Sequence, residues 1–145
     1  MNFSQLKRHF EESDRLAQLL GIKVEEAHRG YARLRMELEE KHRNGVGLAH
    51  GGVIFTLADV AFAVAANAEH TSAALSAQTS LSFLRMGEKG PLTAEAHTLH
   101  DGRTLVVVDV EIRDGSAKLL ATARITGART SLALLPQDAE NNIIE

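Results

Sequence analysis

The chain of 145 residues contains no cysteine and no tryptophan, and it has only one tyrosine and two prolines. Without cysteine there is no disulfide, no thiolate nucleophile and no sulfur ligand for a metal. The net charge is only −3 and the pI is near 6.2, so electrostatics give no reason to expect binding to nucleic acid or to an anionic membrane. The length and the ordinary composition predict one domain over 1–145.

Long hydrophobic runs are also scarce, and the one candidate is AHGGVIFTLADVAFAVAANA at 49–68. Its length approaches that of a membrane span. It carries Asp59 and Asn67, however, and a charge at the bilayer centre costs at least about 2.5 kcal/mol, which an alanine-rich segment does little to offset. We therefore expect a buried helix rather than a membrane span. The start, MNFSQLKRHFEES, is too polar for a secretory signal, which favours a cytoplasmic protein.

Before this apolar segment, the pattern predicts helices and then strands. Leucine and phenylalanine recur at helical spacing over 4–20, which predicts one or two short helices in an N-terminal segment (1–20), closed by Gly21. Apolar residues then alternate with polar ones over 31–38, as in a strand with one buried face. Residues 22–28 are expected to pair with that strand through a turn near Gly30.

After the apolar segment, alternation returns in four strands. Turn signals occur at EKGP (88–91) and at two Asp-Gly pairs, 101–102 and 114–115. Tight turns make neighbouring strands antiparallel, so we predict an α+β fold in which an antiparallel sheet wraps the long helix. The tail at 136–145 is expected to be loosely ordered. The four strands are expected over 75–83, 93–100, 105–112 and near 117–128. In the first of them, the odd-numbered residues are expected to lie on one face.

The apolar helix is hydrophobic on nearly all sides, so we expect the sheet and a partner subunit to cover it. Leu105 and Val107, on the second face of their strand, indicate a further apolar surface and therefore oligomerisation.

Asp59 is the one charged residue within the apolar helix. It lies about two turns inside, too far for an N-cap, and the positions three and four residues away hold no cation. Because a buried charge is costly unless it is paired, we expect a functional role, with bonding to distant groups as the structural alternative.

The glycine-rich loop NGVGLAHGG (44–52) leads into the helix. Free amide groups at a helix N-terminus favour negative charge, such as the oxyanion formed when a carbonyl is attacked. Gly51 has no side chain and would let a substrate carbonyl approach its N–H. The alternative is that these glycines only allow close packing.

Asn44, His50-Gly51-Gly52 and Leu57-Ala58-Asp59 together resemble the hotdog-fold acyl-CoA thioesterases of the PaaI-like, phenylacetate-degradation branch. The resemblance extends over about 20–130 and includes SLSFLRM (80–86), the pattern Gly90-x-Leu92-x-Ala94 and Gly102-Arg103. It implies a long helix wrapped by an antiparallel sheet. It also implies homodimers that pair into homotetramers, with active sites at the dimer interface.

The resemblance also implies roles for single residues. The Gly51 N–H would bind the thioester carbonyl, and Asp59 from the partner subunit would act as general base for water or as nucleophile. Asn44 would position water or substrate, and His50 would support the loop near the thioester. One departure is Ala63, where some hotdog branches carry Ser or Thr one turn after the acid, so water positioning would rest on Asn44 or on backbone groups.

For CoA phosphates, the resemblance suggests Arg103, and Arg85 is a weaker candidate; the alternative for Arg103 is an exposed turn arginine. CoA is then part of the substrate and no cofactor is expected. No metal site is expected either. His97 and His100, three apart on a strand, should point to opposite faces, and no histidine spacing matches zinc.

These features together predict hydrolysis of a CoA thioester to a free acid and CoA. The resemblance favours an aryl- or hydroxyaryl-acetyl group, with medium-chain acyl groups left open, and Phe55, Phe62 and Phe83 are available to line a pocket. A hotdog dehydratase would need an HxPG-type motif, which is missing. A non-catalytic acyl-CoA-binding or sensing module is the alternative, although such proteins are expected to lack the acid and to carry a DNA-binding domain. A purely structural oligomer would leave both Asp59 and the glycine loop unexplained.

Overall fold

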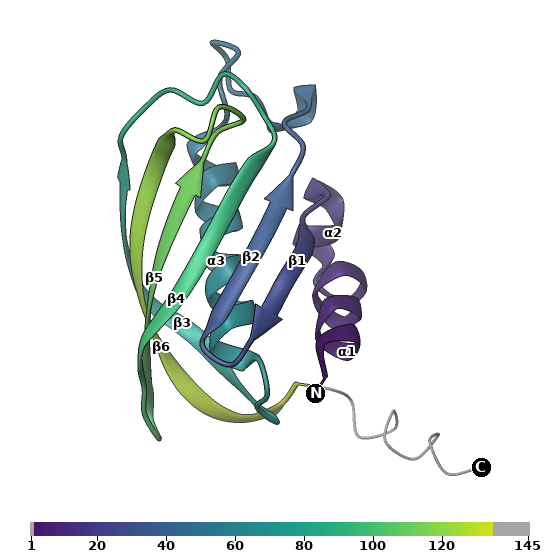
Figure 1. Cartoon of the computed structure of the whole chain (residues 1–145), viewed down its shortest axis with the longest axis vertical. Coiled ribbons are helices and arrows are strands. Elements are labelled where there is room, and N and C mark those ends of the chain that lie inside the picture. The colour runs from purple at the N-terminus through teal and green to yellow at the C-terminus, as the bar shows by residue number, and fades with distance from the viewer. Residues whose placement is uncertain (1, 135–145) are drawn as a thin grey trace, which may run out of the picture.

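The computed structural model describes residues 2–134 and shows a six-stranded antiparallel sheet curved around a long helix (Figure 1). Two strands, one long helix and four strands follow one another as predicted, and the α+β class is confirmed. The strands lie in the order β1-β2-β4-β5-β6-β3. The elements are α1 (Phe3–Arg8), a π-helical turn (His9–Ser13), α2 (Arg15–Leu20), β1 (Lys23–His28), β2 (Tyr31–Met36), a 3-10 turn (Glu40–His42), α3 (Gly51–Asn67), β3 (Ser72–Phe83), β4 (Leu92–Asp101), β5 (Leu105–Arg113) and β6 (Leu119–Ala133).

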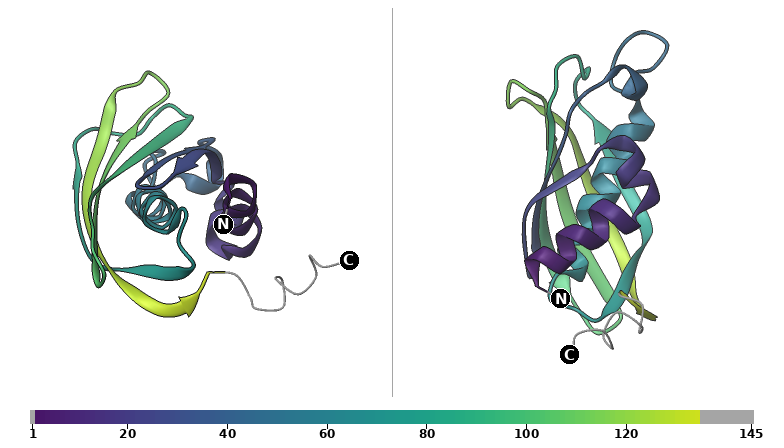
Figure 2. Two further views of the ribbon diagram at one scale, coloured as in Figure 1. Left: turned by 60° about the horizontal axis from the view of Figure 1, so that its bottom comes forward. Right: turned by 90° about the vertical axis from the view of Figure 1, so that its right-hand side faces the viewer.

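The hydrophobic core fills the space between α3 and the concave face of the sheet, and Figure 2 shows the sheet curving around the helix. Burial alternates along β2 and β5 as the sequence predicts. Four of the ten buried residues of α3 are alanines, and these small side chains let the strands pack closely around the helix. The buried strand positions are Ala32, Leu34 and Met36 in β2 and Val106, Val108, Val110 and Ile112 in β5.

The N-terminal helices pack beside β1 (Figure 2). Asn2 caps α1, Asp14 caps α2, and Gly21 ends α2 in the left-handed conformation, which confirms the predicted helical segment and its end. Glu11 joins these helices to the sheet, because its carboxylate accepts a hydrogen bond from the Val24 N–H at 2.9 Å.

A β-bulge in β3 changes which of its side chains share a face. The register with β6 shifts at Ala77, and one extra residue moves the alternation by one position. Leu75 therefore lies opposite Ala128 on the outer face of the sheet, whereas Phe83 lies opposite the buried Ala121 on the inner face. The prediction that the odd-numbered residues of 75–83 share one face was wrong for this reason.

A second bulge, at Leu99 in β4, has the same effect. His97 pairs with Asp109 and His100 pairs with Val107, two positions on the outer face of β5. The two histidines therefore share the outer face, and the prediction of opposite faces was wrong. Within residues 2–134, no three potential ligands gather into a metal site.

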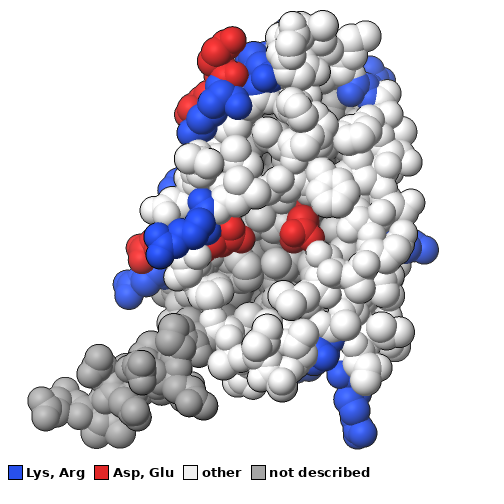
Figure 3. All heavy atoms as spheres, turned by 180° about the vertical axis from the view of Figure 1, so that it is seen from behind, with Lys and Arg blue, Asp and Glu red and all other residues white. Residues whose placement is uncertain are grey.

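One face of α3 is not covered by the sheet. Along it lie exposed Gly52 and Phe55 and half-buried Thr56, Asp59 and Ala63, which follow one another at helical spacing. The sheet of one chain thus leaves this face of α3 open, and its cover by a partner subunit stays a prediction. Figure 3 shows the side of the molecule behind the sheet, where largely uncharged residues surround a hollow that contains acidic side chains. In the part of the chain that the structure describes, no helix has the length and apolar character needed to cross a membrane.

Candidate active site

The N-terminal end of α3 is built by the loop that precedes it. His50 is the N-cap, with extended backbone, and its own N–H donates to the His42 carbonyl at 2.8 Å. The Gly52 N–H donates to His50 Nδ1 at 2.9 Å. Because Nδ1 accepts this hydrogen bond, the neutral imidazole carries its proton on Nε2. The His50 side chain is exposed. His50 thus supports the helix start and presents a hydrogen-bond donor at the surface.

Gly51 is the first residue of α3. The N–H groups of Val53 and Ile54 donate to the His50 carbonyl, and that of Gly52 to the His50 ring. The Gly51 N–H has no acceptor among residues 2–134. It therefore remains available at the positive end of the helix dipole. The aromatic ring of Phe83 lies beside it: a Cβ at Gly51 would be 3.2 Å from Phe83 Cζ.

Asn44 organises the loop itself. Its Oδ1 accepts hydrogen bonds from the N–H groups of Val46 and Leu48, at 3.0 and 3.1 Å. The loop is closed further by the Asn44 N–H, which donates to the Leu48 carbonyl at 2.7 Å. The amide oxygen is thus occupied by the backbone, and only the Nδ2 group is left to contact a substrate or a water.

Asp59 lies on the uncovered face of α3, and its carboxylate makes no hydrogen bond or ion pair with any group in residues 2–134. It follows Gly51 by eight residues, which at 1.5 Å per residue is about 12 Å along the helix axis. A carbonyl bound at the Gly51 N–H is therefore out of reach of Asp59 of the same chain. The structure places Asn44, His50 and Gly51 in the loop and helix start at the N-terminal end of α3, whereas Asp59 of the same chain lies about two turns further along the helix.

The remaining predicted site residues fall at both ends of α3. Arg85 follows β3 near the N-terminal end, whereas Arg103 lies in the β4–β5 turn at the C-terminal end (Figure 1). Of the aromatic residues, Phe62 is 1% exposed and belongs to the core, while Phe55 and Phe83 are 43% and 56% exposed. Only the last two are accessible beside the helix start.

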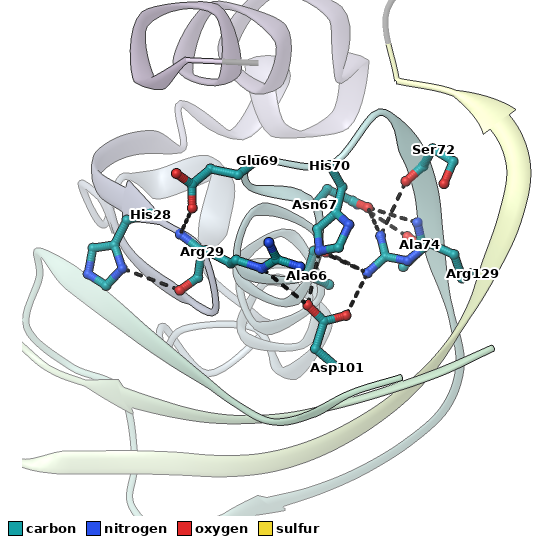
Figure 4. Close-up of polar contacts among 10 residues, drawn as sticks. All are labelled: His28, Arg29, Ala66, Asn67, Glu69, His70, Ser72, Ala74, Asp101 and Arg129. Atoms are coloured by element: carbon teal, nitrogen blue, oxygen red, sulfur yellow. Dashed lines mark hydrogen bonds and ion pairs between the residues drawn. The ribbon is translucent and has the colours of Figure 1, made fainter. Parts of the chain in front are cut away.

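The C-terminal end of α3 holds a polar cluster that the sequence interpretation missed (Figure 4). The Arg129 guanidinium donates to the Ala66 carbonyl at 3.0 Å, the Ser72 carbonyl at 3.2 Å and Asp101 Oδ1 at 3.1 Å. His70 Nε2 lies 3.0 Å from Asp101 Oδ2. One signal was present: strict alternation from Ile125 places Arg129 on the inner, apolar face of β6.

Asp101 is the carboxylate at the centre of this cluster, and Arg29 Nε also lies 3.8 Å from its Oδ2. Partial burial alone would raise the pKa of Asp101, but hydrogen bonds and charge from His70 and Arg129 outweigh it and hold the pKa below its usual value. Asn67, the last residue of α3, is buried; its Oδ1 accepts from the Ala74 N–H at 2.7 Å and its Nδ2 donates to the Ala74 carbonyl at 3.2 Å. This end of the helix is thus fixed to β3, β4 and β6.

Comparison with known proteins agrees with this fold. The family model described as thioesterase superfamily matches residues 46–132. The acyl-coenzyme A thioesterase PaaI of Escherichia coli is 40% identical over 78% of this chain and 81% of its own length. The structure of E. coli PaaI superposes with a TM-score of 0.83 at 34% identity, over 90% of this chain and 94% of that one. A Streptococcus mutans protein solved with acetyl CoA bound gives a TM-score of 0.71 at 31% identity, over 75% and 88% of the two chains. With its long helix wrapped by an antiparallel sheet, the chain belongs to the thioesterase superfamily and is a PaaI-like hotdog protein.

Proposed function

We propose that two copies of this chain together form an acyl-CoA thioesterase, which converts a CoA thioester and water to a carboxylic acid and CoA. CoA is part of the substrate, and no cofactor takes part. The similarity to E. coli PaaI supports the reaction class, and the S. mutans relative with bound acetyl CoA supports the ligand. The observation that carries the proposal is the Gly51 N–H at the start of α3, which has no acceptor among residues 2–134.

In this mechanism the thioester carbonyl accepts a hydrogen bond from the Gly51 N–H. Asp59 of the second copy takes a proton from water, and the hydroxide adds to the carbonyl carbon. The negative charge that forms on the carbonyl oxygen is stabilised by the Gly51 N–H and the helix dipole, an interaction typically worth 10²–10³ in rate. Collapse of the adduct breaks the C–S bond, and the CoA sulfur leaves with a proton. The Asn44 Nδ2 group is available to orient the water.

The second copy is part of the proposal because the groups of one chain lie about 12 Å apart along α3. Several features favour a self-complementary contact. α3 has an uncovered face, and β3 is an edge strand whose free side could pair with another strand. Phe55 and Phe83 are exposed beside them. Pairing of such dimers into tetramers through the outer face near Leu105 and Val107 is a further part of the proposal.

The acyl group is proposed to be aryl- or hydroxyaryl-acetyl. Phe55 and Phe83 flank the start of α3, and an aromatic acyl group packs favourably against aromatic rings. A medium-chain acyl group would use the same apolar contacts, so the choice is tested directly in the assay below.

The test follows thiol release from a panel of acyl-CoAs with a thiol-reactive dye. The panel contains phenylacetyl-CoA, hydroxyphenylacetyl-CoA and a medium-chain acyl-CoA. The protein contributes no background, because it has no cysteine. Asp59→Asn is nearly isosteric, and we expect it to keep its fold and its CoA binding while turnover falls by about 10²–10⁴. Hydrolysis by Asp59→Asn at the wild-type rate would exclude Asp59 as the base. Wild type that binds CoA esters without cleaving any would favour the binding-module alternative.

Subunit mixing tests whether the site is shared. Gly51→Pro removes the N–H, and Asp59→Asn removes the base. After unfolding and refolding at a one-to-one ratio, about half of the dimers contain one chain of each kind. Each such dimer has one intact site, so about a quarter of the wild-type activity should return. If each site were built from one chain, mixing would restore nothing.

A further inference from the structure

The chain contains sixteen Lys and Arg residues. Nine of them form ion pairs with carboxylates, and the other seven have no ion pair among residues 2–134. Three of the seven, Arg85, Lys89 and Lys118, line one surface groove of about 340 Å³. Unpaired cations repel one another, so their convergence in one groove suggests an anionic ligand.

We propose that this groove, the cationic groove, binds phosphate groups of CoA while the thioester lies at the start of α3. The proposal rests on the proposed function and identifies a binding site for the charged end of the same substrate. Arg presents a planar fork of donors to phosphate, and Lys presents a compact point charge. Met86 and Ser116 also line the groove.

The cationic groove is joined directly to the candidate active site. The Ala49 N–H, just before His50, donates to the Gly87 carbonyl at 2.7 Å. Gly87 lies in the β3–β4 segment that also carries Arg85 and Lys89. That segment begins after Phe83, whose ring lies beside Gly51. A ligand can therefore have one end at the Gly51 N–H and its phosphates beside the β3–β4 segment, with the pantetheine arm between them.

The groove is held in shape by backbone contacts between its two walls. The Gly115 N–H donates to the Lys89 carbonyl at 3.0 Å, which joins the β5–β6 turn to the β3–β4 segment. A Cβ at Gly115 would clash with the Gly90 carbonyl oxygen, so only glycine permits this approach. The N–H groups of Leu84 and Arg85 also donate to the Leu120 carbonyl. The cations are thus brought together before any ligand binds, which lowers the ordering cost of binding.

Two carboxylates also line the groove, Glu88 and Asp114. Asp114 is turned toward its own loop, where Oδ1 accepts from the N–H groups of Ser116 and Lys118 at 2.8 and 3.0 Å. The hydrogen bond from Lys118 N–H is the main cause that lowers the pKa of Asp114, so this carboxylate is charged at neutral pH. Three cations against two carboxylates leave the groove with one positive charge.

The test compares two substrates that differ only in their phosphates: phenylacetyl-CoA and S-phenylacetylpantetheine. The variant is Lys89→Gln/Lys118→Gln. The control is Arg8→Gln/Arg15→Gln, which removes the same charge from exposed, unpaired side chains of the N-terminal segment. We expect the ratio of kcat/KM for the CoA ester over that for the pantetheine ester to fall about tenfold in the variant, through KM, and to stay unchanged in the control. Added salt should weaken the CoA ester's advantage in wild type more than in the variant.

An unchanged ratio in the lysine variant would overturn the proposal while leaving the hydrolase function intact. The proposal would also be overturned if the ratio fell in Arg103→Gln but not in the lysine variant, because this result would place the phosphates at the other end of α3. Calorimetry with free CoA and with pantetheine separates the two hypotheses further, since it needs no turnover. Suppose that wild type binds CoA but hydrolyses no thioester, and that the lysine variant binds CoA more weakly than wild type. This result would support the cationic groove and reject the proposed function.

Discussion

The two ends of α3 differ in what their polar groups bind. At the C-terminal end, Arg129 and Asn67 donate to carbonyls of the helix and of β3, and Asp101 and His70 complete the polar cluster. At the N-terminal end, the Gly51 N–H has no acceptor among residues 2–134, and the surrounding side chains are exposed. One end of the helix is fixed, and the other end is chemically available.

This difference matches the needs of a catalyst. An oxyanion site must be held within a fraction of an ångström, yet its donors must not be occupied by the protein. Fixing α3 at its far end, through strands β3, β4 and β6, holds the helix axis without occupying the N–H groups at its start. The division predicts that changes at the start of α3 reduce activity with little loss of stability, and that changes at its end do the reverse.

Among changes at the two ends of α3, the largest expected effect is that of Gly51→Pro. Proline is well tolerated at the first position of a helix, and the extended backbone of His50 suits a residue before proline. The substitution removes the N–H, and we expect kcat to fall by about 10²–10³ with little change in Tm. Gly51→Ala is the matched control: it keeps the N–H, and its methyl group meets only the tip of the exposed Phe83 ring. Equal losses in both variants would mean that Gly51 serves packing alone.

At the other end, Arg129→Met should affect stability. The Arg129 side chain is only 10% exposed, and its loss removes the donor to the Ala66 carbonyl in α3 and the Ser72 carbonyl in β3, and one partner of Asp101. We expect a loss of roughly 3 kcal/mol in the free energy of unfolding, which corresponds to a Tm lower by roughly 6–12 °C. Activity per folded molecule should be unchanged.

Arg124→Met on the same strand is the control for Arg129→Met. Arg124 is 61% exposed and pairs with Asp109 on the outer face, so its removal should cost only about 0–1 kcal/mol. Urea titrations at 25 °C measure both variants. Equal losses of stability would show that the cluster at the end of α3 contributes no more than an ordinary surface pair.

A smaller effect is expected from Asp101→Asn, and it should depend on pH. The pKa of Asp101 is lowered in the folded protein, so its carboxylate stabilises the fold above its unfolded pKa of about 3.9. This contribution is lost as the pH falls through the lower folded-state value. The difference in stability between wild type and Asp101→Asn should therefore be largest near neutral pH and shrink below about pH 4. A difference that does not change with pH would contradict the ion-pair explanation.

Much of the fold and the start of α3 were predictable from the sequence. The alternation along 31–36 and 105–112 and the Asp-Gly turns are local signals, and local signals led to the correct element order and to the buried faces of β2 and β5. The start of α3 was also predictable, because His50-Gly51-Gly52 combines a capping side chain with residues that leave the backbone open.

Other features were not predictable from local patterns. The bulges at Ala77 and Leu99 involve residues with no bulge preference, and each reverses the facing of the residues that follow it. The extent of the uncovered face of α3 could not be predicted for another reason. Its apolar sequence shows that a cover is needed, but it does not show whether the cover belongs to the same chain. The hydrogen bonds of Asn44 Oδ1 within the loop were not predictable either, because they depend on the loop's closed shape; the role of Asn44 in positioning water or substrate stays a prediction.

The smallest effect is expected at His50, where it separates two roles of one side chain. His50→Ala removes the acceptor of the Gly52 N–H and should lower stability by about 1 kcal/mol. His50→Asn retains a capping oxygen and should restore that stability, but it lacks the Nε2–H group. Thermal unfolding and kcat/KM are measured for both variants. If His50→Asn is stable and fully active, the imidazole acts only as a cap, and the start of α3 contributes its backbone alone to the chemistry. If it is stable but slow, the exposed Nε2–H contacts the substrate, and the available end of α3 includes a side chain as well as the Gly51 N–H.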